Sequence, residues 1–252
     1  MNEGGNVEPS EVLKPEALQE YRVRLDRIGG ELYRLNSNLY VLGKLLGFPT
    51  DLILGPDRNT FFRLVQGALA RDSILVVTKL LTDDGEGSMR WLSNFVGKNI
   101  KAEHQKWLKK SLLKDELNKA TELARQKKLK YFRDNIIAHD GKDPQTRTLV
   151  VPNTNFMVSM EDLHSICEAM NRYFDVLCLG EPIAVLPLSY ILPPPGHDNR
   201  SDIEHILALI VKDSAFYKAP SEPWWADVRP KWPQWRIDIL NEYRRMFGEP
   251  DV

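Results

Sequence analysis

The chain is poor in cysteine and lacks the common phosphate-binding and nucleophile motifs. Cys167 and Cys178 are the only two cysteines among 252 residues. In a single helix they would lie roughly 16 Å apart along the axis, beyond the reach of a disulfide bond. There is no GxxxxGK[ST], GxSxG or GxGxxG sequence, so phosphate-loop and serine-hydrolase functions have no support. We therefore expect two reduced thiols, and a function that uses neither a phosphate-binding loop nor a serine nucleophile.

Long hydrophobic runs and a dominant charge sign are also missing. The formal net charge is −1, which does not suggest a nucleic-acid binder by itself. The most apolar stretch, residues 176–192, contains Glu181, Pro182 and Pro187, whereas a membrane helix needs about 20 mostly apolar residues. The start, MNEGGNVEPSEV, has neither the basic nor the apolar region of a signal peptide. We therefore expect a soluble, cytoplasmic protein without a membrane partner.

Apolar residues recur at helical spacing through most of the chain, and no series of strands is evident. The pattern predicts an all-α fold, an antiparallel helical bundle over residues 15–180. Residues 1–14 are expected to be flexible, and residues 181–252 to form a proline-rich linker and a C-terminal helical extension. The expected helices are residues 15–46, 59–81, 88–96, 102–139, 159–179, 201–216 and 234–247. Four tryptophans of the extension, Trp224, Trp225, Trp232 and Trp235, are expected to pack it onto the bundle or to contact a partner protein, rather than to stack on bases.

Positive charge gathers in the longest expected helix. Residues 98–133 contain 12 Lys or Arg against 4 Asp or Glu, an excess of eight positive charges in a chain of net charge −1. Such a helix would attract a polyanion through phosphate contacts. A solvated helix face explains the same charges equally well.

The sequence RDNIIAH, residues 133–139, follows this basic segment. On one helix Arg133 and His139 would lie roughly 120° apart around the axis and 9 Å apart along it. Asn135 and His139 would share a stripe, being four residues apart. Arg133 and His139 therefore make a compact site only if a second copy of the helix end completes it, which predicts a homodimer.

This segment resembles the Arg-x(4–6)-His motif of the HEPN superfamily (higher eukaryotes and prokaryotes nucleotide-binding). Asp134 fits, because the residue after the arginine is often Asn, Asp or His in that superfamily. With ARDSILVVTKLLTDD (residues 70–84) on an earlier helix, residues 15–180 are similar to the branch related to phage abortive-infection proteins. The resemblance implies a helical bundle that dimerises. It also implies a role in phage defence or a toxin–antitoxin system, with an antitoxin or regulatory protein as partner.

The resemblance further implies a metal-independent endoribonuclease without a cofactor. His139 would act as general base or acid on the RNA 2′-hydroxyl and the leaving oxygen. Arg133 would hold the scissile phosphate, and Asp134 or Asn135 would orient one of the two. The products would carry a 2′,3′-cyclic phosphate and a 5′-hydroxyl. The residues expected to bind RNA are Lys127, Lys128, Lys130 and Lys142.

Two other interpretations stay open. Some HEPN proteins are non-catalytic modules for dimerisation and for binding a nucleotide, RNA or a protein, and Arg and His at a helix end also favour the helix dipole without catalysis. The letters AHDGK also resemble the HD-type metal phosphohydrolases, with His104, His139–Asp140 and Asp175 as ligands. Gly141 stands where that family usually has an apolar residue.

Two further segments contain aspartates that could belong to a site but also have structural explanations. TDDGEG, residues 82–87, lacks the remaining spacing of a calcium loop and is expected to be a turn. Arg71 and Asp72, mid-helix in an apolar stretch, either face the same cleft as Arg133 or form an internal ion pair.

Overall fold

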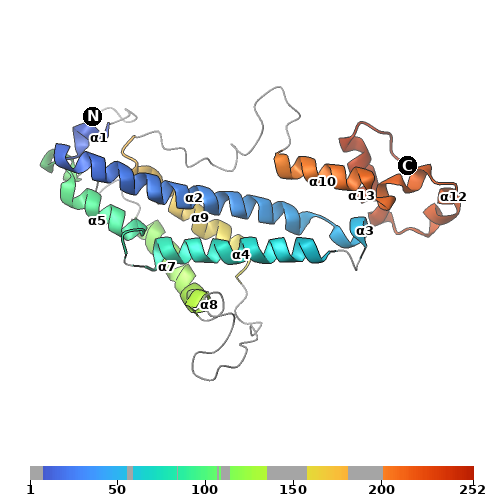
Figure 1. Cartoon of the computed structure of the whole chain (residues 1–252), viewed down its shortest axis with the longest axis horizontal. Helices are drawn as coiled ribbons and strands as arrows, with labels where there is room; N and C mark the ends of the chain where they lie inside the picture. Colours follow the sequence, from blue (N-terminus) through green and yellow to red (C-terminus); the bar gives the residue numbers. More distant parts are fainter. Residues whose placement is uncertain are drawn as a thin grey trace, which may run out of the picture. The chain divides into compact units, whose positions relative to one another are not determined.

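A computed structural model describes seven parts of the chain: residues 8–55, 59–83, 85–106, 108, 114–134, 158–180 and 201–252. Within them every regular element is helical, apart from one isolated bridge between Leu13 and Ile100, which confirms the all-α prediction. Contacts divide the chain into two units. The bundle unit comprises residues 1–40 and 68–189, and the C-terminal unit comprises residues 41–67 and 190–252. The long helices α2 and α4 each contribute to both units (Figure 1).

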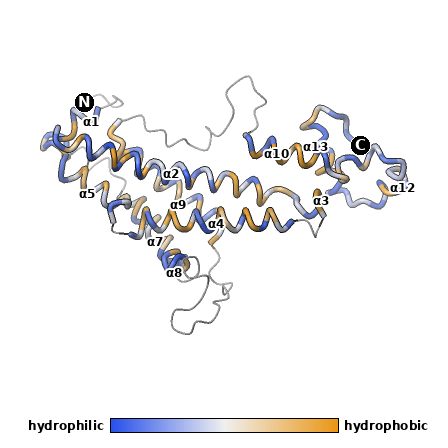
Figure 2. Tube along the Cα trace, viewed as in Figure 1, coloured by the Kyte–Doolittle hydropathy of each residue, from blue (hydrophilic) through white to orange (hydrophobic). Residues whose placement is uncertain are grey.

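Three helices form the frame of the bundle unit: α2 (Leu18–Gly47), α4 (Thr60–Leu81) and α9 (Met160–Leu177). Hydrophobic residues recur along α2 (Figure 2), and six of them at helical spacing are at most 1% exposed: Tyr21, Leu25, Ile28, Leu32, Leu35 and Leu39. Leu46 continues the same spacing near the end of the helix but is 53% exposed. Around the frame lie α1 (Pro9–Val12), a 3₁₀ turn (Pro15–Ala17), α5 (Met89–Asn99), a second 3₁₀ turn (Ala102–His104), α7 (Lys114–Gln126) and α8 (Leu129–Phe132). Among the described residues, no helix is both long and apolar enough for a membrane span.

Side-chain contacts fix the direction of the frame helices. The Tyr21 hydroxyl donates to the Leu177 carbonyl at 2.8 Å, while Asn36 bonds Asn171, so α2 and α9 are antiparallel. Between α2 and α4, Lys79 pairs with Glu31, and Asp72 pairs with Arg34 at 3.1 Å, so these helices are antiparallel too. Asp72 of the Arg71–Asp72 pair thus bonds another helix near the surface, where the Arg34 and Asp72 side chains are 48% and 37% exposed, so this ion pair is not the internal one expected.

Residues 8–14 are ordered, unlike the flexible N-terminus predicted for residues 1–14, of which residues 1–7 lie outside the described part of the chain. Pro9 begins α1, where its fixed φ suits the first helical turn. Val12 and Leu13 are fully buried in the bundle core. The backbone N–H of Lys101 donates to the Val12 carbonyl at 2.9 Å, and that of Lys14 to the Asn99 carbonyl at 2.9 Å. Two apolar side chains and these backbone hydrogen bonds hold the segment in place. Two apolar residues are too few to show a helical period, so the sequence did not predict this contact.

The single helix predicted over residues 102–139 is wrong in its continuity. The described part is broken between α7 and α8, where Lys128 has a left-handed backbone with φ 52°. A lysine rarely adopts this conformation, so nothing in the sequence indicated the break. Ser159 caps α9 through a reciprocal capping box with Asp162. The helix predicted over residues 201–216 is also wrong in its continuity, because it ends at Asp213 and Ser214 caps a separate short helix, Ala215–Lys218.

The C-terminal unit is built from the end of α2, the start of α4 and the helices after residue 200. The later helices are α10 (Asp202–Asp213), α11 (Ala215–Lys218), α12 (Trp225–Val228) and α13 (Gln234–Met246), with 3₁₀ turns at Ala219–Ser221 and Arg229–Lys231. The short helix α3 (Thr50–Leu54) between α2 and α4 also belongs to this unit. Trp232 stacks on Phe216, meets Trp225 edge-on and lies beneath the Arg236 guanidinium. Its aromatic surface thus stabilises this unit internally. The predicted boundary at residue 180 differs from the contact pattern, which groups residues 41–67 with residues 190–252.

Candidate functional site

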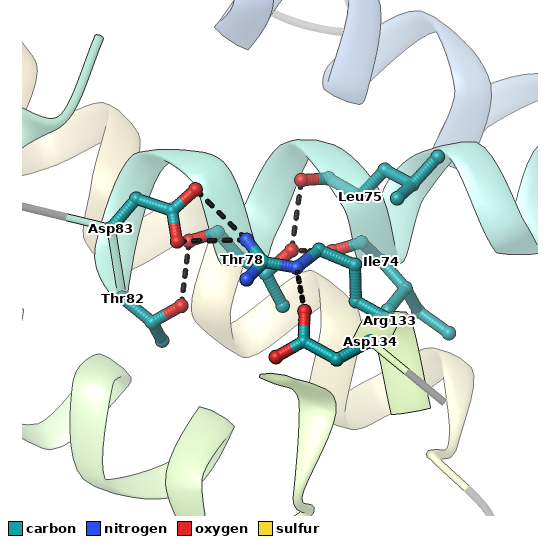
Figure 3. Close-up of polar contacts among 7 residues, drawn as sticks. All are labelled: Ile74, Leu75, Thr78, Thr82, Asp83, Arg133 and Asp134. Atoms are coloured by element: carbon teal, nitrogen blue, oxygen red, sulfur yellow. Dashed lines mark hydrogen bonds and ion pairs between the residues drawn. The ribbon is translucent and has the colours of Figure 1, made fainter. Parts of the chain in front are cut away.

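Arg133 lies where the end of α4 meets the turn that follows α8 (Figure 3). Its Nη1 donates to both carboxylate oxygens of Asp83, each at 2.8 Å, and its Nε donates to Oδ1 of Asp134 at 2.7 Å. The Arg133 side chain is 19% exposed, against 37% for Asp83 and 45% for Asp134. The guanidinium is therefore held from two directions close to the surface, with its Nη2 nitrogen taking part in neither carboxylate contact.

The end of α4 places Asp83 opposite the arginine. The Thr78 hydroxyl donates to the carbonyls of Ile74 and Leu75 at 2.9 Å, and the Thr82 hydroxyl donates to the Thr78 carbonyl at 2.8 Å. The backbone N–H of Asp83 also reaches the Thr78 carbonyl, at 3.3 Å. These bonds satisfy carbonyls of the last helical turns and fix the backbone that carries the carboxylate (Figure 3).

On the other side, Arg133 and Asp134 extend α8 as a π-helical turn, a conformation that often occurs at functional sites. The hydrogen bond to Asp134, and after it those to Asp83, raises the pKa of the Arg133 guanidinium, while partial burial opposes the rise. Arg133 thus stays charged at every physiological pH. Two carboxylates against one guanidinium leave this cluster with a formal charge of −1.

Several of the expected site residues lie outside the described part of the chain: Asn135, His139 and Lys142. Their assigned roles remain predictions. Of the expected RNA-binding lysines, Lys127 forms an ion pair with Asp162 at 2.8 Å. The hydrogen bond from Lys127 is the main cause that lowers the pKa of Asp162. That lysine therefore ties α7 to the first turn of α9, and its contact with RNA also remains a prediction.

Lys128 and Lys130 line a groove of about 430 Å³ between α4, α5, α7 and α8. The groove contains two more cations, Arg90 and Arg125, and the aromatic ring of Tyr131. Two residues of the groove lining are close in sequence to residues of the Arg133 cluster. Thr82 directly precedes Asp83, and Tyr131 lies two residues before Arg133. Positive side chains and an aromatic ring are the groups that hold a nucleotide strand.

Metal ligation finds no support among the described residues, where no three His, Cys, Asp or Glu side chains gather. Of the ligands considered for an HD-type site, His104 lies in a 3₁₀ turn and Asp175 on α9, while His139 and Asp140 fall outside the described residues. Burial raises the pKa of Asp175. Cys167 and Cys178 are both buried free thiols.

Asp83 is the site residue that sequence reasoning missed. The sequence assigned TDDGEG only to a turn, and the separation of 50 residues between Asp83 and Arg133 hid their contact. The one available signal was the pair of aspartates directly after an apolar helix, within the longer segment ARDSILVVTKLLTDD.

One comparison with known proteins identifies a relationship. A family model named HEPN_AbiU2 and described as AbiU2 matches residues 18–180, more than half of the chain. The matched range runs from the start of α2 to the end of α9 and contains Asp83, Arg133 and the RDNIIAH segment. Neither the search of curated proteins nor that of solved structures gave a match.

Proposed function

The chain belongs to the AbiU2 family of HEPN proteins, and we propose that it is a metal-independent endoribonuclease with Arg133 as its phosphate-binding arginine. The single observation that carries this proposal is the orientation of Arg133. Its guanidinium is fixed by Asp83 and Asp134 at a partly exposed position, and the sequence neighbours Thr82 and Tyr131 line a groove rich in cations. A preoriented guanidinium near the surface suits transition-state stabilisation, because little reorganisation is needed when charge develops.

The proposed reaction is an internal transesterification. His139 removes the proton of the RNA 2′-hydroxyl, and the 2′-oxygen forms a bond to the adjacent phosphorus. The bond from phosphorus to the 5′-oxygen breaks, and a protonated imidazole returns the proton to that leaving oxygen. Arg133 donates to the non-bridging phosphate oxygens, which carry additional negative charge in the transition state. The 2′,3′-cyclic phosphate and the 5′-hydroxyl together contain all the atoms of the substrate.

A homodimer is part of the proposal. On one helix Arg133 and His139 would be separated by roughly 120° around the axis, so one copy would place them on different faces. Two copies related by a twofold axis bring both types of side chain to one cleft. By family membership we further propose a role in defence against phage, with an antitoxin or another regulatory protein restraining the enzyme.

One observation favours a second candidate, a non-catalytic HEPN module that binds RNA or a protein partner. Two carboxylates already occupy Nε and Nη1 of Arg133 and reverse the charge of the cluster. A phosphate would have to share the guanidinium with them or displace one. Under this candidate the cluster joins α4 to the turn after α8, and the cationic groove alone binds the ligand.

RNA cleavage in excess chelator separates the two candidates. The purified chain should cut single-stranded RNA under these conditions, and His139→Ala and Arg133→Ala should each abolish cutting without loss of helical content. Arg172→Ala, which removes an exposed arginine of α9, is the matched control and should cut normally. Cutting that persists in His139→Ala excludes the assigned base. RNA binding without cutting favours the second candidate, and activity that returns only with Mn²⁺ contradicts the metal-independent reaction.

A further inference from the structure

The groove between α4, α5, α7 and α8 carries four positive side chains without an acidic residue in its described lining. Arg90 comes from α5, Arg125 from α7, and Lys128 and Lys130 from the junction of α7 and α8. All four are exposed. Arg125 shares its charge with Glu122, through bonds of 2.9 and 3.0 Å. Cations from three helices converge here, whereas a solvated helix face would carry them on one.

The break between α7 and α8 directs the side chains of Lys128 and Lys130 to the groove. Lys128 adopts φ 52°, a conformation that costs a non-glycine residue of order 1–3 kcal/mol. The turn is closed by the backbone N–H of Lys128, which donates to the Arg125 carbonyl at 2.9 Å. A glycine would take this conformation without the cost. The presence of lysine at the strained position is explained if its charge is required there.

The remaining lining defines what the groove recognises. The hydroxyls of Thr82 and Thr121 donate to the carbonyls of Thr78 and Leu117, each at 2.8 Å, so they are engaged within their own helices. The cations are therefore the principal donors. Tyr131 is 45% exposed and offers a ring at the same groove. A volume of about 430 Å³ falls in the range of small-ligand pockets, roughly 300–1,000 Å³.

We propose that this groove is a second RNA subsite, which holds the backbone phosphate and base next to the phosphodiester that Arg133 contacts. Arg90, Lys128 and Lys130 neutralise the phosphate, and Tyr131 stacks on the base. The subsite rests on the proposed RNA substrate but not on catalysis. Lys127 does not line this groove.

The test is binding of a 5′-labelled, fully 2′-O-methylated RNA oligonucleotide, which cannot be cleaved, measured by fluorescence anisotropy over a range of salt concentrations. For single strands the slope of log K against log salt is about −0.7 per neutralised phosphate contact. Lys130→Gln and Lys128→Gly should each weaken binding and flatten the slope by up to about 0.7. Lys128→Gly keeps the fold, since glycine accepts the positive φ. Tyr131→Leu should weaken binding and leave the slope unchanged.

Arg172→Gln is the matched control, an exposed arginine on α9 away from the groove lining, and it should bind like the unmodified chain. Binding unchanged in both lysine variants, or a wild-type chain that does not bind the oligonucleotide, overturns the subsite. Equal weakening in Arg172→Gln also overturns it, because the effect would then be one of net charge. A chain that binds through these residues but never cuts natural RNA supports the subsite and contradicts the nuclease.

Discussion

The bundle unit contains two polar clusters that join helices in very different surroundings. In the buried cluster, Asn36 of α2 and Asn171 of α9 exchange hydrogen bonds at 3.0 and 3.2 Å, and the Cys167 thiol donates to Asn36 at 3.1 Å. Asn36 and Cys167 are each 3% exposed. In the edge cluster, Arg133, Asp83 and Asp134 are charged and 19–45% exposed. One cluster is neutral and mostly buried, and the other is ionic and partly exposed.

The difference suggests that the buried cluster determines how the helices pack, while the edge cluster serves the proposed reaction. Neutral buried groups that satisfy one another specify how α2 and α9 pack, and removing one partner leaves another without its bond. Ion pairs near the surface contribute little to stability, so their placement is better explained by a need for oriented charge. We therefore expect changes in the buried cluster to affect folding and changes in the edge cluster to affect activity.

The largest expected contrast is the chemical reactivity of the buried cluster. Burial raises the pKa of the Cys167 thiol to about 12 from 9.0, which lowers its thiolate fraction at pH 8 by about a thousandfold. Alkylation of Cys167 in the native chain should be slower than in the denatured chain by at least that factor, followed by mass spectrometry of its peptide. Comparable rates in the two states would show that the cluster opens readily.

Arg133→Lys should lower RNA cleavage by about 10²–10³-fold, the usual cost of removing an oriented transition-state donor. Lysine keeps the charge but lacks the planar fork that contacts Asp83 and Asp134. Stability should change by less than about 1 kcal/mol, because the pairs are partly exposed. Single-turnover cleavage and urea unfolding measure the two effects. A large loss of stability with unchanged cleavage would reverse the assignment of the edge cluster.

Asn36→Leu should have the opposite profile. It removes the bonds to Asn171 and to the Cys167 thiol, and the unfolding free energy should fall by about 1–3 kcal/mol. Cleavage per folded molecule should stay the same. Urea unfolding with the Arg133→Lys chain as comparator measures the difference, and an Asn36→Leu chain as stable as the unmodified one would remove the distinction between the clusters.

The smallest effect is expected from an ion pair in the C-terminal unit. Burial acts to raise the pKa of Glu204, but hydrogen bonds from Lys44 and Ser201 outweigh it and hold the pKa at about 2, against 4.5 for a free carboxyl. Because the folded-state pKa is the lower one, its contribution to stability is present above about pH 4.5 and is lost as the pH falls towards 2. With partial exposure we expect no more than about 1 kcal/mol.

Glu204→Gln should remove that pH-dependent part and leave stability at low pH almost unchanged. Thermal unfolding of both chains between pH 2 and 7 measures it. An equal difference between the chains at every pH would show that the side chain acts by packing alone.

Helix periodicity predicted the helices of the bundle well, because the apolar residues that become buried recur at helical spacing in the sequence. The buried positions of α2 from Tyr21 to Leu39 and the capping box of Ser159 with Asp162 follow from local spacing, whereas Leu46 continues the same spacing and is 53% exposed. The break at Lys128 could not be predicted, since only its backbone conformation marks it. Asp83 was missed because its contact with Arg133 depends on tertiary packing across 50 residues. Asn135 and His139 lie outside the described residues, so their half of the site is still predicted from the motif alone.

The most direct measurement is cleavage, in excess chelator, of an RNA whose mapped cut site carries a single 2′-deoxy or 2′-O-methyl substitution. An enzyme that uses Arg133 and an internal 2′-oxygen nucleophile should leave a 2′,3′-cyclic phosphate on the unmodified RNA. It should not cut the substituted position, while other sites in the same strand are still cut. Cutting that continues at the substituted position would contradict this chemistry, because no 2′-oxygen would be available to attack the phosphorus.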